Sequence, residues 1–308
     1  MMMQGGLRIG LDSPVSMKGQ IMLRLRRDTL LFPKGRKKAL TLSYDDGITQ
    51  DERLIALMKQ YQIKGTFNLN PGLMGDRDHL VQPGIDVSHY KFKKEEICRI
   101  YASQEIAVHS MTHPDLARVP QNMAAYEIAE CRKELEELIC TPVTGMAYPF
   151  GTYNQNVKDA AKSCGITYSR TTCSTHRFNL PSDFLEWHPT CHHTEGCLFD
   201  LLEEFIKPVD DTSSHSPLLF YVWGHSYEFD AYQQWNAIEK FLKTASGKKD
   251  VWYATNGEIC EYINSVKHLV YSASGDYIYN PSCLDVWMLI DRKVYCIRSG
   301  QTVIIETS

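Results

Sequence analysis

The chain has 308 residues, of which 43% are apolar and 23% are charged, and its formal net charge at pH 7 is −4. These values are ordinary for a globular protein with a sizeable core, and the length suits one large α/β domain or two domains. The densest basic run, Lys34–Lys38 (KGRKK), is too short to indicate a nucleic-acid partner.

The ten cysteines are scattered and form no CxxC pair. A chain of this length can build its core without disulfides, so we expect mostly free thiols in a reducing compartment. The N-terminus lacks an apolar block of signal-peptide length, and no segment has the ~20 apolar residues that a transmembrane helix needs. We therefore expect a cytoplasmic protein with no membrane partner. Residues 1–20 show little periodicity, and the two interpretations are a disordered lead-in and an upstream start.

Strands and helices are predicted to alternate along most of the chain. Short apolar runs predict strands at Ala39–Tyr44, Gly65–Leu69, Glu105–Val108, Thr144–Tyr148, Ile166–Ser169, Leu218–Trp223 and Val251–Ala254. Helical spacing and capping signals predict helices at Asp51–Gln62, Lys93–Ser103, Asn122–Cys140, Asn154–Cys164, Leu198–Ile206, Trp235–Thr244 and Asn256–Ser265. Residues 73–92 are polar and irregular and are predicted to be a loop, while residues 171–197 show no clear pattern.

This alternation indicates an α/β fold with parallel strands and crossover helices. A (β/α) barrel explains why polar residues follow so many strands, because barrel enzymes place their chemistry on the loops at the carboxyl ends of the strands. An open doubly wound sheet is the alternative, although no GxGxxG follows the first strand. The predicted barrel covers residues 21–265. Residues 266–308 contain short β-rich runs between turn residues and predict a small β-rich appendage.

Two adjacent carboxylates follow the first confident strand, at Asp45 and Asp46. Consecutive side chains of a strand point in different directions unless the chain turns, and Gly47 permits such a turn. One carboxylate could then bind a metal ion while the other stands over a bound water. A simple Asp-Gly turn is the other interpretation of these three residues.

Three histidines are further candidates. His109 and His113 have i, i+4 spacing, which on a helical turn places both imidazoles on one face, as in metal-binding histidine pairs. One aspartate and two histidines suit zinc and other transition ions and leave positions open for water and substrate. His225 follows an apolar strand, where it could act as a general acid to a leaving amine. An incidental pair and a satisfied loop histidine are the alternatives.

Four stretches together resemble the polysaccharide deacetylases of the NodB-homology class, also called carbohydrate esterase family 4. They are LTLSYDDG at 40–47, HSMTH at 109–113, AYPFG at 147–151 and the strand that leads to His225. The resemblance covers residues 38–262. The resemblance implies a distorted (β/α) barrel fold. It also implies an enzyme that removes N- or O-linked acetyl groups from sugars with the help of a divalent metal, often zinc.

The resemblance also implies roles for single residues. Asp45 matches the catalytic base and His225 the general acid, and the matched metal ligands are Asp46, His109 and His113. The expected ion is Zn²⁺, with Co²⁺, Ni²⁺ and Fe²⁺ as alternatives. The expected enzyme is a metal-dependent hydrolase that acts on the carbon–nitrogen (non-peptide) bond of an acetylated carbohydrate. A small amide is the alternative substrate, and a non-catalytic carbohydrate-binding protein is the alternative from a different class.

Other residues are assigned by position in the family motifs. Tyr148 lies in the motif whose backbone N–H helps to hold the oxyanion, and Trp187 is the counterpart of a tryptophan near the acid, so both are predicted to contact substrate. Ala147 stands where the family has an arginine that orients the base, so another cation does this or the base is held differently. Three further histidines could line the pocket, bind a second ion or lie on the surface: His188, His192 and His193.

Overall fold

The computed structural model describes residues 28–209 and 217–306, so the predicted lead-in at residues 1–20 lies outside the described residues. The strands of the main sheet are β2 (Lys38–Asp45), β3 (Thr66–Leu69), β6 (Glu105–Val108), β7 (Gly145–Ala147), β8 (Tyr168–Arg170), β9 (Cys191–His192), β10 (Leu218–Gly224) and β11 (Val251–Tyr253). They form an 8-stranded sheet in the order β8-β7-β6-β3-β2-β10-β9, with β11 also paired to β2. The pairings are parallel throughout, as predicted.

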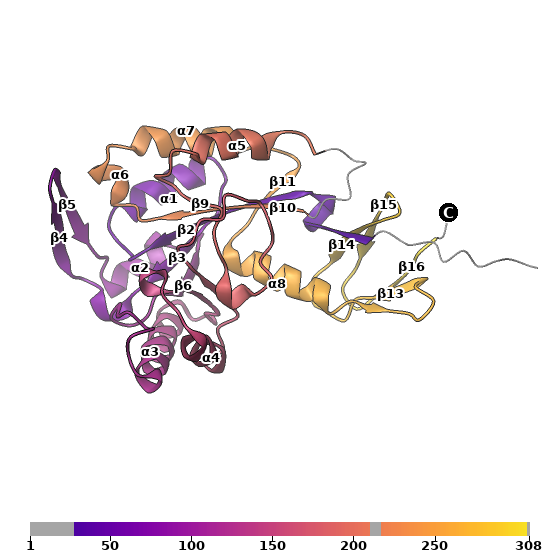
Figure 1. Cartoon of the computed structure of the whole chain (residues 1–308), viewed down its shortest axis with the longest axis horizontal. Coiled ribbons are helices and arrows are strands. Elements are labelled where there is room, and N and C mark those ends of the chain that lie inside the picture. The colour runs from indigo at the N-terminus through magenta and orange to yellow at the C-terminus, as the bar shows by residue number, and fades with distance from the viewer. Residues whose placement is uncertain (1–27, 210–216, 307–308) are drawn as a thin grey trace, which may run out of the picture.

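The helices lie on the outside of this sheet (Figure 1). They are α1 (Asp51–Gln60), α2 (Ile97–Ile100), α3 (Gln121–Ile139), α4 (Gln155–Ser163), α5 (Leu198–Ile206), α6 (Glu228–Ala231), α7 (Trp235–Ala245) and α8 (Asn256–Lys267). Helices α5 and α7 pack together on one side, and α3 and α4 pack together on the other. Among the described residues, no helix combines the length and the apolar character needed to span a bilayer.

The sheet curls and is closed by one short segment that contains β9. At its start, the Trp187 N–H donates to the Ser169 carbonyl of β8 at 3.0 Å, and the Thr171 N–H donates to the Trp187 carbonyl at 3.0 Å. A few residues later Cys191 pairs with Val222 of β10. The segment therefore connects β8 to β10 and completes the ring, which confirms the predicted distorted (β/α) barrel.

The central strand β2 shows why the barrel interior is polar at its carboxyl end. Its even-numbered side chains, such as Leu42 and Tyr44, belong to the apolar cluster that the outer helices complete. Its odd-numbered side chains point to the other face, because side chains alternate along a strand. There the Thr41 hydroxyl donates to the Asn256 side chain of α8 at 2.8 Å, and Ser43 accepts from Asn68 of β3 at 2.9 Å. Asp45 is the next odd-numbered residue of this face.

The prediction of a loop at residues 73–92 is wrong for most of that range. Strands β4 (Arg77–Gln82) and β5 (Ile85–Tyr90) form an antiparallel hairpin that projects from the barrel (Figure 1). Most of its side chains are exposed or half-buried on both faces, so it lacks the apolar alternation that predicts a strand. A bridge between Ile48 and Lys91 fixes the base of the hairpin beside the end of β2.

The C-terminal residues form the predicted β-rich appendage. The bounds of its strands are β12 (Val270–Tyr271), β13 (Tyr277–Tyr279), β14 (Val286–Ile290), β15 (Lys293–Ile297) and β16 (Thr302–Ile304). Strand β1 (Asp28–Leu31) pairs antiparallel with β14, although it precedes the barrel in sequence and fell within the predicted range 21–265. Ile278 and Ile297 lie in the small core of this appendage. The described chain therefore begins in the β1-β14-β15 sheet and ends in the β12-β13-β16 sheet, and both sheets belong to the appendage.

We expect Ile278→Ala to lower the free energy of unfolding by about 2–5 kcal/mol, because it leaves a cavity in the appendage core. The matched control is Ile304→Ala on the neighbouring strand, since Ile278 is 0% exposed and Ile304 is 65% exposed. Urea titration of both variants measures the difference. Equal stabilities of the two variants would contradict this assignment of the core.

Candidate active site

Polar side chains from several parallel strands meet at the carboxyl-end mouth of the barrel. Asp45 and Arg170 are the last residues of β2 and β8, Ala147 is the last residue of β7, and His109 and His225 follow β6 and β10. Because the carboxyl ends of parallel strands lie at the same edge, residues far apart in sequence come together there. Asp45 Oδ2 lies 3.8 Å from His109 Nε2 and 3.9 Å from His225 Nε2.

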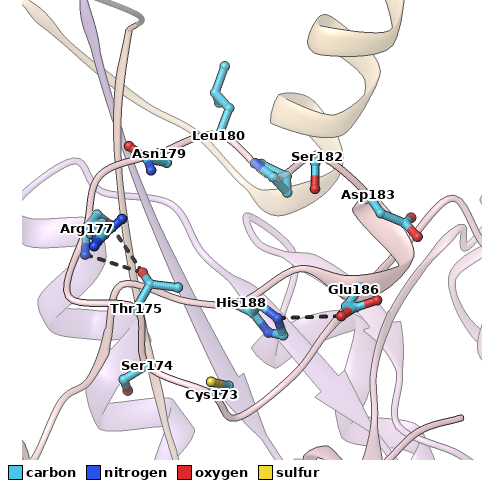
Figure 2. Close-up of a pocket in the computed structure, with 11 residues that line it drawn as sticks. Cys173, Ser174, Thr175, Arg177, Asn179, Leu180, Ser182, Asp183, Glu186 and His188 are labelled. Atoms are coloured by element: carbon cyan, nitrogen blue, oxygen red, sulfur yellow. Dashed lines mark hydrogen bonds and ion pairs between the residues drawn. The ribbon is translucent and has the colours of Figure 1, made fainter.

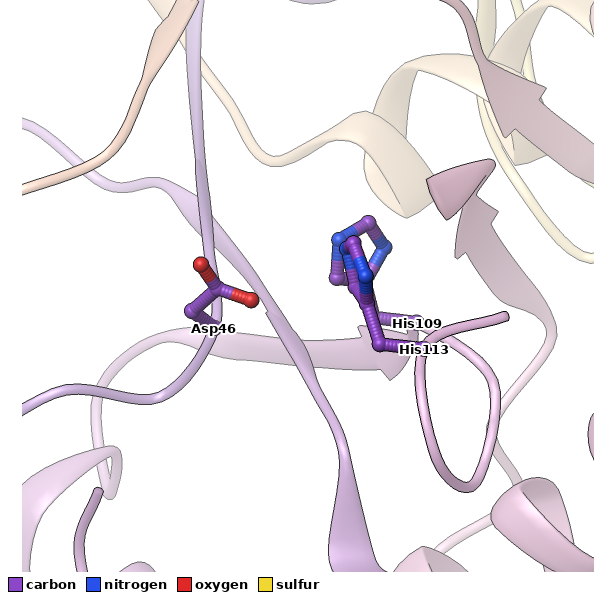
Figure 3. Close-up of side chains that lie close together, drawn as sticks. All are labelled: Asp46, His109 and His113. Atoms are coloured by element: carbon purple, nitrogen blue, oxygen red, sulfur yellow. The ribbon is translucent and has the colours of Figure 1, made fainter. Parts of the chain in front are cut away.

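Asp46, His109 and His113 form a group whose possible ligand atoms all lie within 4.8 Å of one another. Figure 3 shows the Asp46 carboxylate facing the two imidazole rings. Asp46 has a left-handed backbone (φ 81°) and is followed by Gly47 (φ 66°), so the chain turns directly after Asp45 and sends the two carboxylates in different directions, as predicted.

The helical turn expected at residues 109–113 is wrong. The backbone bends instead, with left-handed φ angles of 62° at Ser110 and 60° at His113. The Ser110 hydroxyl accepts a hydrogen bond from the His113 N–H at 3.0 Å and holds the bend. The two rings still come together, with their centroids 4.8 Å apart.

The two histidines of this group fit a transition ion. Burial lowers the pKa of His109 to about 4, and burial also lowers the pKa of His113, so both rings are neutral at pH 7. His109 Nδ1 lies 2.8 Å from the Ala147 carbonyl, which can only accept, so Nδ1 carries the proton and Nε2 keeps its lone pair. A histidine ligand oriented through its second nitrogen is the usual arrangement in metal sites.

Asp46 is held as a carboxylate by groups that the sequence did not indicate. Burial alone would raise its pKa, but His89 Nε2 at 3.2 Å and Lys91 Nζ at 3.4 Å keep that pKa well below its usual range. Lys91 also donates to the Asp46 carbonyl at 2.9 Å. Both side chains belong to the end of the β4–β5 hairpin, which was predicted as a loop, so their place beside Asp46 could not be foreseen.

Arg170 provides the cation that Ala147 does not. Its guanidinium forms a buried hydrogen-bonded ion pair with Asp45 Oδ2, while Asn68 donates to Asp45 Oδ1 at 2.8 Å. Burial alone would raise the pKa of Asp45, but Arg170 and the nearby histidines lower it. Arg170 is the register partner of Ala147 on the adjacent strand. An arginine at the end of the next predicted strand was therefore the available signal for this residue.

His225 is paired with a second carboxylate that sequence reasoning missed. The Glu228 Oε2 atom accepts from the His225 N–H at 3.0 Å and lies 3.5 Å from His225 Nδ1. Burial alone would lower the pKa of His225, but the carboxylates of Glu228, Asp46 and Asp45 raise it to about 9. The ring is therefore charged at pH 7, with Nε2 facing Asp45. The spacing i, i+3 across the start of α6 was the available signal.

The backbone N–H of Tyr148, which was predicted to hold the oxyanion, already forms a hydrogen bond within the protein. The Tyr148 N–H donates to the Arg170 carbonyl at 3.0 Å as part of the sheet, and its hydroxyl donates to the Leu185 carbonyl. Phe150 lies two residues further along the same AYPFG stretch. Phe150 has a left-handed backbone (φ 57°), its ring lies 4.6 Å from that of His113, and its N–H has no hydrogen-bond partner among the described residues.

The structure does not bring Trp187 or His188 to this mouth. Trp187 is 1% exposed and packs between Tyr221 and Phe184 in the core, so it offers no surface to a ligand. His188 lines a separate pocket of about 530 Å³ formed by residues 173–188 (Figure 2). There its ring bonds to Thr171 Oγ1 at 2.6 Å. Trp223 contacts the mouth, because the Arg170 guanidinium lies 4.2 Å from the centroid of its ring.

The family model for polysaccharide deacetylase matches residues 33–169. The chain is therefore similar to the polysaccharide deacetylase family over residues 33–169. The matched region includes Asp45, Asp46, His109 and His113, and it ends directly before Arg170. The resemblance inferred from the sequence motifs is thereby confirmed.

Similar proteins agree with this assignment. The putative polysaccharide deacetylase YxkH of Bacillus subtilis (strain 168) is 24% identical over 142 residues, which cover 45% of this chain and 46% of YxkH. The chain thus matches about half the length of this relative. The putative polysaccharide deacetylase from Mycobacterium smegmatis has a TM-score of 0.57 at 15% identity, over 78% of this chain and 94% of that one, and shows the same fold.

A third protein is more distant in structure. The family 4 carbohydrate esterase from Streptomyces lividans, solved with acetate, covers 70% of this chain and 91% of its own, with 13% identity and a TM-score of 0.45.

We expect Arg170→Met to lower the free energy of unfolding by about 3–5 kcal/mol at pH 7, because it leaves the Asp45 carboxylate buried without its partner. A double variant that also carries Asp45→Asn should recover part of the lost free energy of unfolding. The matched control is Arg118→Met, since Arg118 is exposed and pairs with Asp115 at the surface. Urea titration of the four proteins tests the prediction.

The same pair should be sensitive to pH. The folded-state pKa of Asp45 is lowered, so its contribution is present above the unfolded pKa of about 4 and is lost as the pH falls through the folded value. Without Arg170, burial raises the pKa of Asp45, so the variant takes up a proton at a higher pH than wild type. The difference in stability between wild type and Arg170→Met should therefore shrink as the pH falls from 7 to 3. A difference that stays constant from pH 7 to pH 3 would contradict the ion pair.

Proposed function

We propose that the protein is a metal-dependent hydrolase that removes acetyl groups from an N-acetylated carbohydrate by cleaving the carbon–nitrogen bond. One observation carries the proposal, namely the convergence of a buried carboxylate, a charged histidine and an Asp-His-His group at one barrel mouth. Asp45 Oδ2 is within 4 Å of both His109 and His225. A protein that only binds sugars needs no such combination of groups.

Asp46, His109 and His113 would hold the divalent ion. One carboxylate and two neutral imidazoles suit Zn²⁺, and Co²⁺, Ni²⁺ or Fe²⁺ are alternatives with the same donor preferences. The free Nε2 of His109 supports this assignment. When bound, such an ion supplies Lewis-acid activation of water and of the acetyl carbonyl.

Asp45 and His225 would carry the two proton transfers. Arg170 and Asn68 fix the Asp45 carboxylate and keep it ionised, so it can accept a proton from the attacking water. His225 is charged and presents Nε2 towards Asp45, so it can donate a proton to the leaving amine. Glu228 positions the His225 ring from the opposite side.

Phe150 would help to stabilise the oxyanion and to bind the substrate. Its N–H lies in the bend beside His113 and could donate to the oxygen that becomes charged in the tetrahedral intermediate. Its ring is 63% exposed next to the site. An exposed aromatic face beside a catalytic mouth favours the apolar face of a sugar ring over a small amide.

We expect Asp45→Asn to lower kcat/KM for N-acetylglucosamine oligomers by roughly 10²–10⁴-fold, the usual contribution of a positioned base, while zinc remains bound. His113→Ala should lose both activity and zinc. The matched control is Asp86→Asn on the exposed hairpin. Amine release and zinc content are measured on the same preparations, and normal turnover by Asp45→Asn would exclude this mechanism.

The role of His225 can be tested through the leaving group. We expect His225→Gln to lower amide deacetylation by roughly 10²-fold or more, because an amine leaves only after it is protonated. The same variant should hydrolyse an aryl acetate at nearly the wild-type rate, since a phenolate needs no acid. Equal losses on both substrates would show that His225 acts in binding rather than as an acid.

A further inference from the structure

A second cluster lies on the far side of His225 from Asp45. It contains His225 and Glu228 together with His192 and His193, and the last two have no role in the proposed mechanism. Four nitrogen atoms converge on one oxygen, Glu228 Oε2. They are the His225 N–H at 3.0 Å, His192 Nε2 at 3.2 Å, His193 Nε2 at 3.2 Å and His225 Nδ1 at 3.5 Å. His192 and His193 come from the segment that closes the barrel.

Hydrogen bonding does not account for this convergence. A carboxylate oxygen offers about two lone pairs, and donors around a carboxylate normally divide between its two oxygens. Neither ring nitrogen of His193 forms a hydrogen bond, although both are buried, and the same is true of His225 Nδ1.

The spacing agrees with a coordination sphere. Tetrahedral zinc with bonds of about 2.0–2.2 Å places its ligand atoms roughly 3.3–3.6 Å apart. The side-chain contacts of 3.2, 3.2 and 3.5 Å around Glu228 Oε2 lie close to this range. The possible ligand atoms of His192, His225 and Glu228 all lie within 4.8 Å of one another.

We propose that His192 Nε2, His225 Nδ1 and Glu228 form a second site for a zinc-class divalent ion, with His193 available as a fourth ligand. The two sites are separated by the imidazole of His225. Its Nε2 faces Asp45 and the Asp46 group, while its Nδ1 faces Glu228.

An ion bound at this second site would inhibit deacetylation, a consequence that rests on the proposed function. An ion bound to Nδ1 uses the lone pair of that nitrogen, so Nδ1 cannot carry a proton. The ring then holds its only proton on Nε2, and donating that proton to an amine would leave an imidazolate, which is a far poorer outcome than a neutral ring. Excess zinc would therefore prevent His225 from acting as the general acid and would leave the base, Asp45, unchanged.

The test is equilibrium dialysis of the full chain against Zn²⁺, with bound zinc measured by elemental analysis. We expect His192→Gln to bind one ion fewer than wild type, His109→Gln also to bind one fewer, and the double variant to bind two fewer. Glu228→Gln, which keeps the shape of the side chain, should repeat the loss seen for His192→Gln. The matched control, His268→Gln, changes an exposed histidine at the end of α8 and should bind as much as wild type.

The outcomes separate the two proposals. If both His192→Gln and Glu228→Gln bind as much zinc as wild type, the second site is overturned and the histidines only position Glu228. If only His109→Gln binds as much as wild type, the second site stands and the metal centre of the proposed function fails. Circular dichroism of each variant confirms that a lost ion does not reflect an unfolded chain.

Activity provides an independent readout. Zinc beyond the amount that fills the first site should lower wild-type deacetylation roughly 100-fold, within the range that a general acid contributes. His192→Gln should resist this inhibition. Wild-type activity that stays constant while the second ion binds would overturn the inhibitory role.

Discussion

The buried ion pair between Arg170 and Asp45 is the interaction on which the barrel mouth depends. It joins the end of β8 to the end of β2, and β8 is itself held by the closing segment at Trp187. A carboxylate as buried as Asp45 would take up a proton without a cation beside it. The pair therefore links closure of the barrel to the charge state of the predicted base. Arg170 reaches Asp45 from β8, so the arginine does not have to stand at position 147 on the adjacent strand β7.

The mouth holds three buried or partly buried carboxylates and matches them with cations. Asp45 faces Arg170, Asp46 faces Lys91, and Glu228 faces the charged His225. Each carboxyl group has a lowered pKa because burial is outweighed by these neighbours. Without a metal the described groups are close to electrically balanced. A bound divalent ion would therefore leave the mouth positive, an environment that favours the developing oxyanion of an acyl-transfer reaction.

The sequence was sufficient for the elements with strong local patterns. The other parallel strands and outer helices were predicted, but β9 and α6 were not. The residues Asp45, Asp46, His109, His113 and His225 were chosen as candidates from their motifs, because apolar periodicity and motif spacing are local. The hairpin β4–β5 was missed because neither of its faces is buried. Arg170 and Glu228 were missed because their roles depend on register between strands and on the turn into α6, which are set by tertiary contacts. Tyr148 and Trp187 were assigned from motif position, but one has its N–H in the sheet and the other lies in the core.

The pairing of β1 with β14 has a consequence for how the chain is made. Asp28 lies opposite Ile290, so the first described strand cannot find its partner until residue 290 has left the ribosome. Closing so long a loop is slow compared with local helix formation. During synthesis the barrel can form while β1 remains an open strand edge, which is a template for pairing with other chains. Synthesis and docking of β14 is therefore the event that protects this edge.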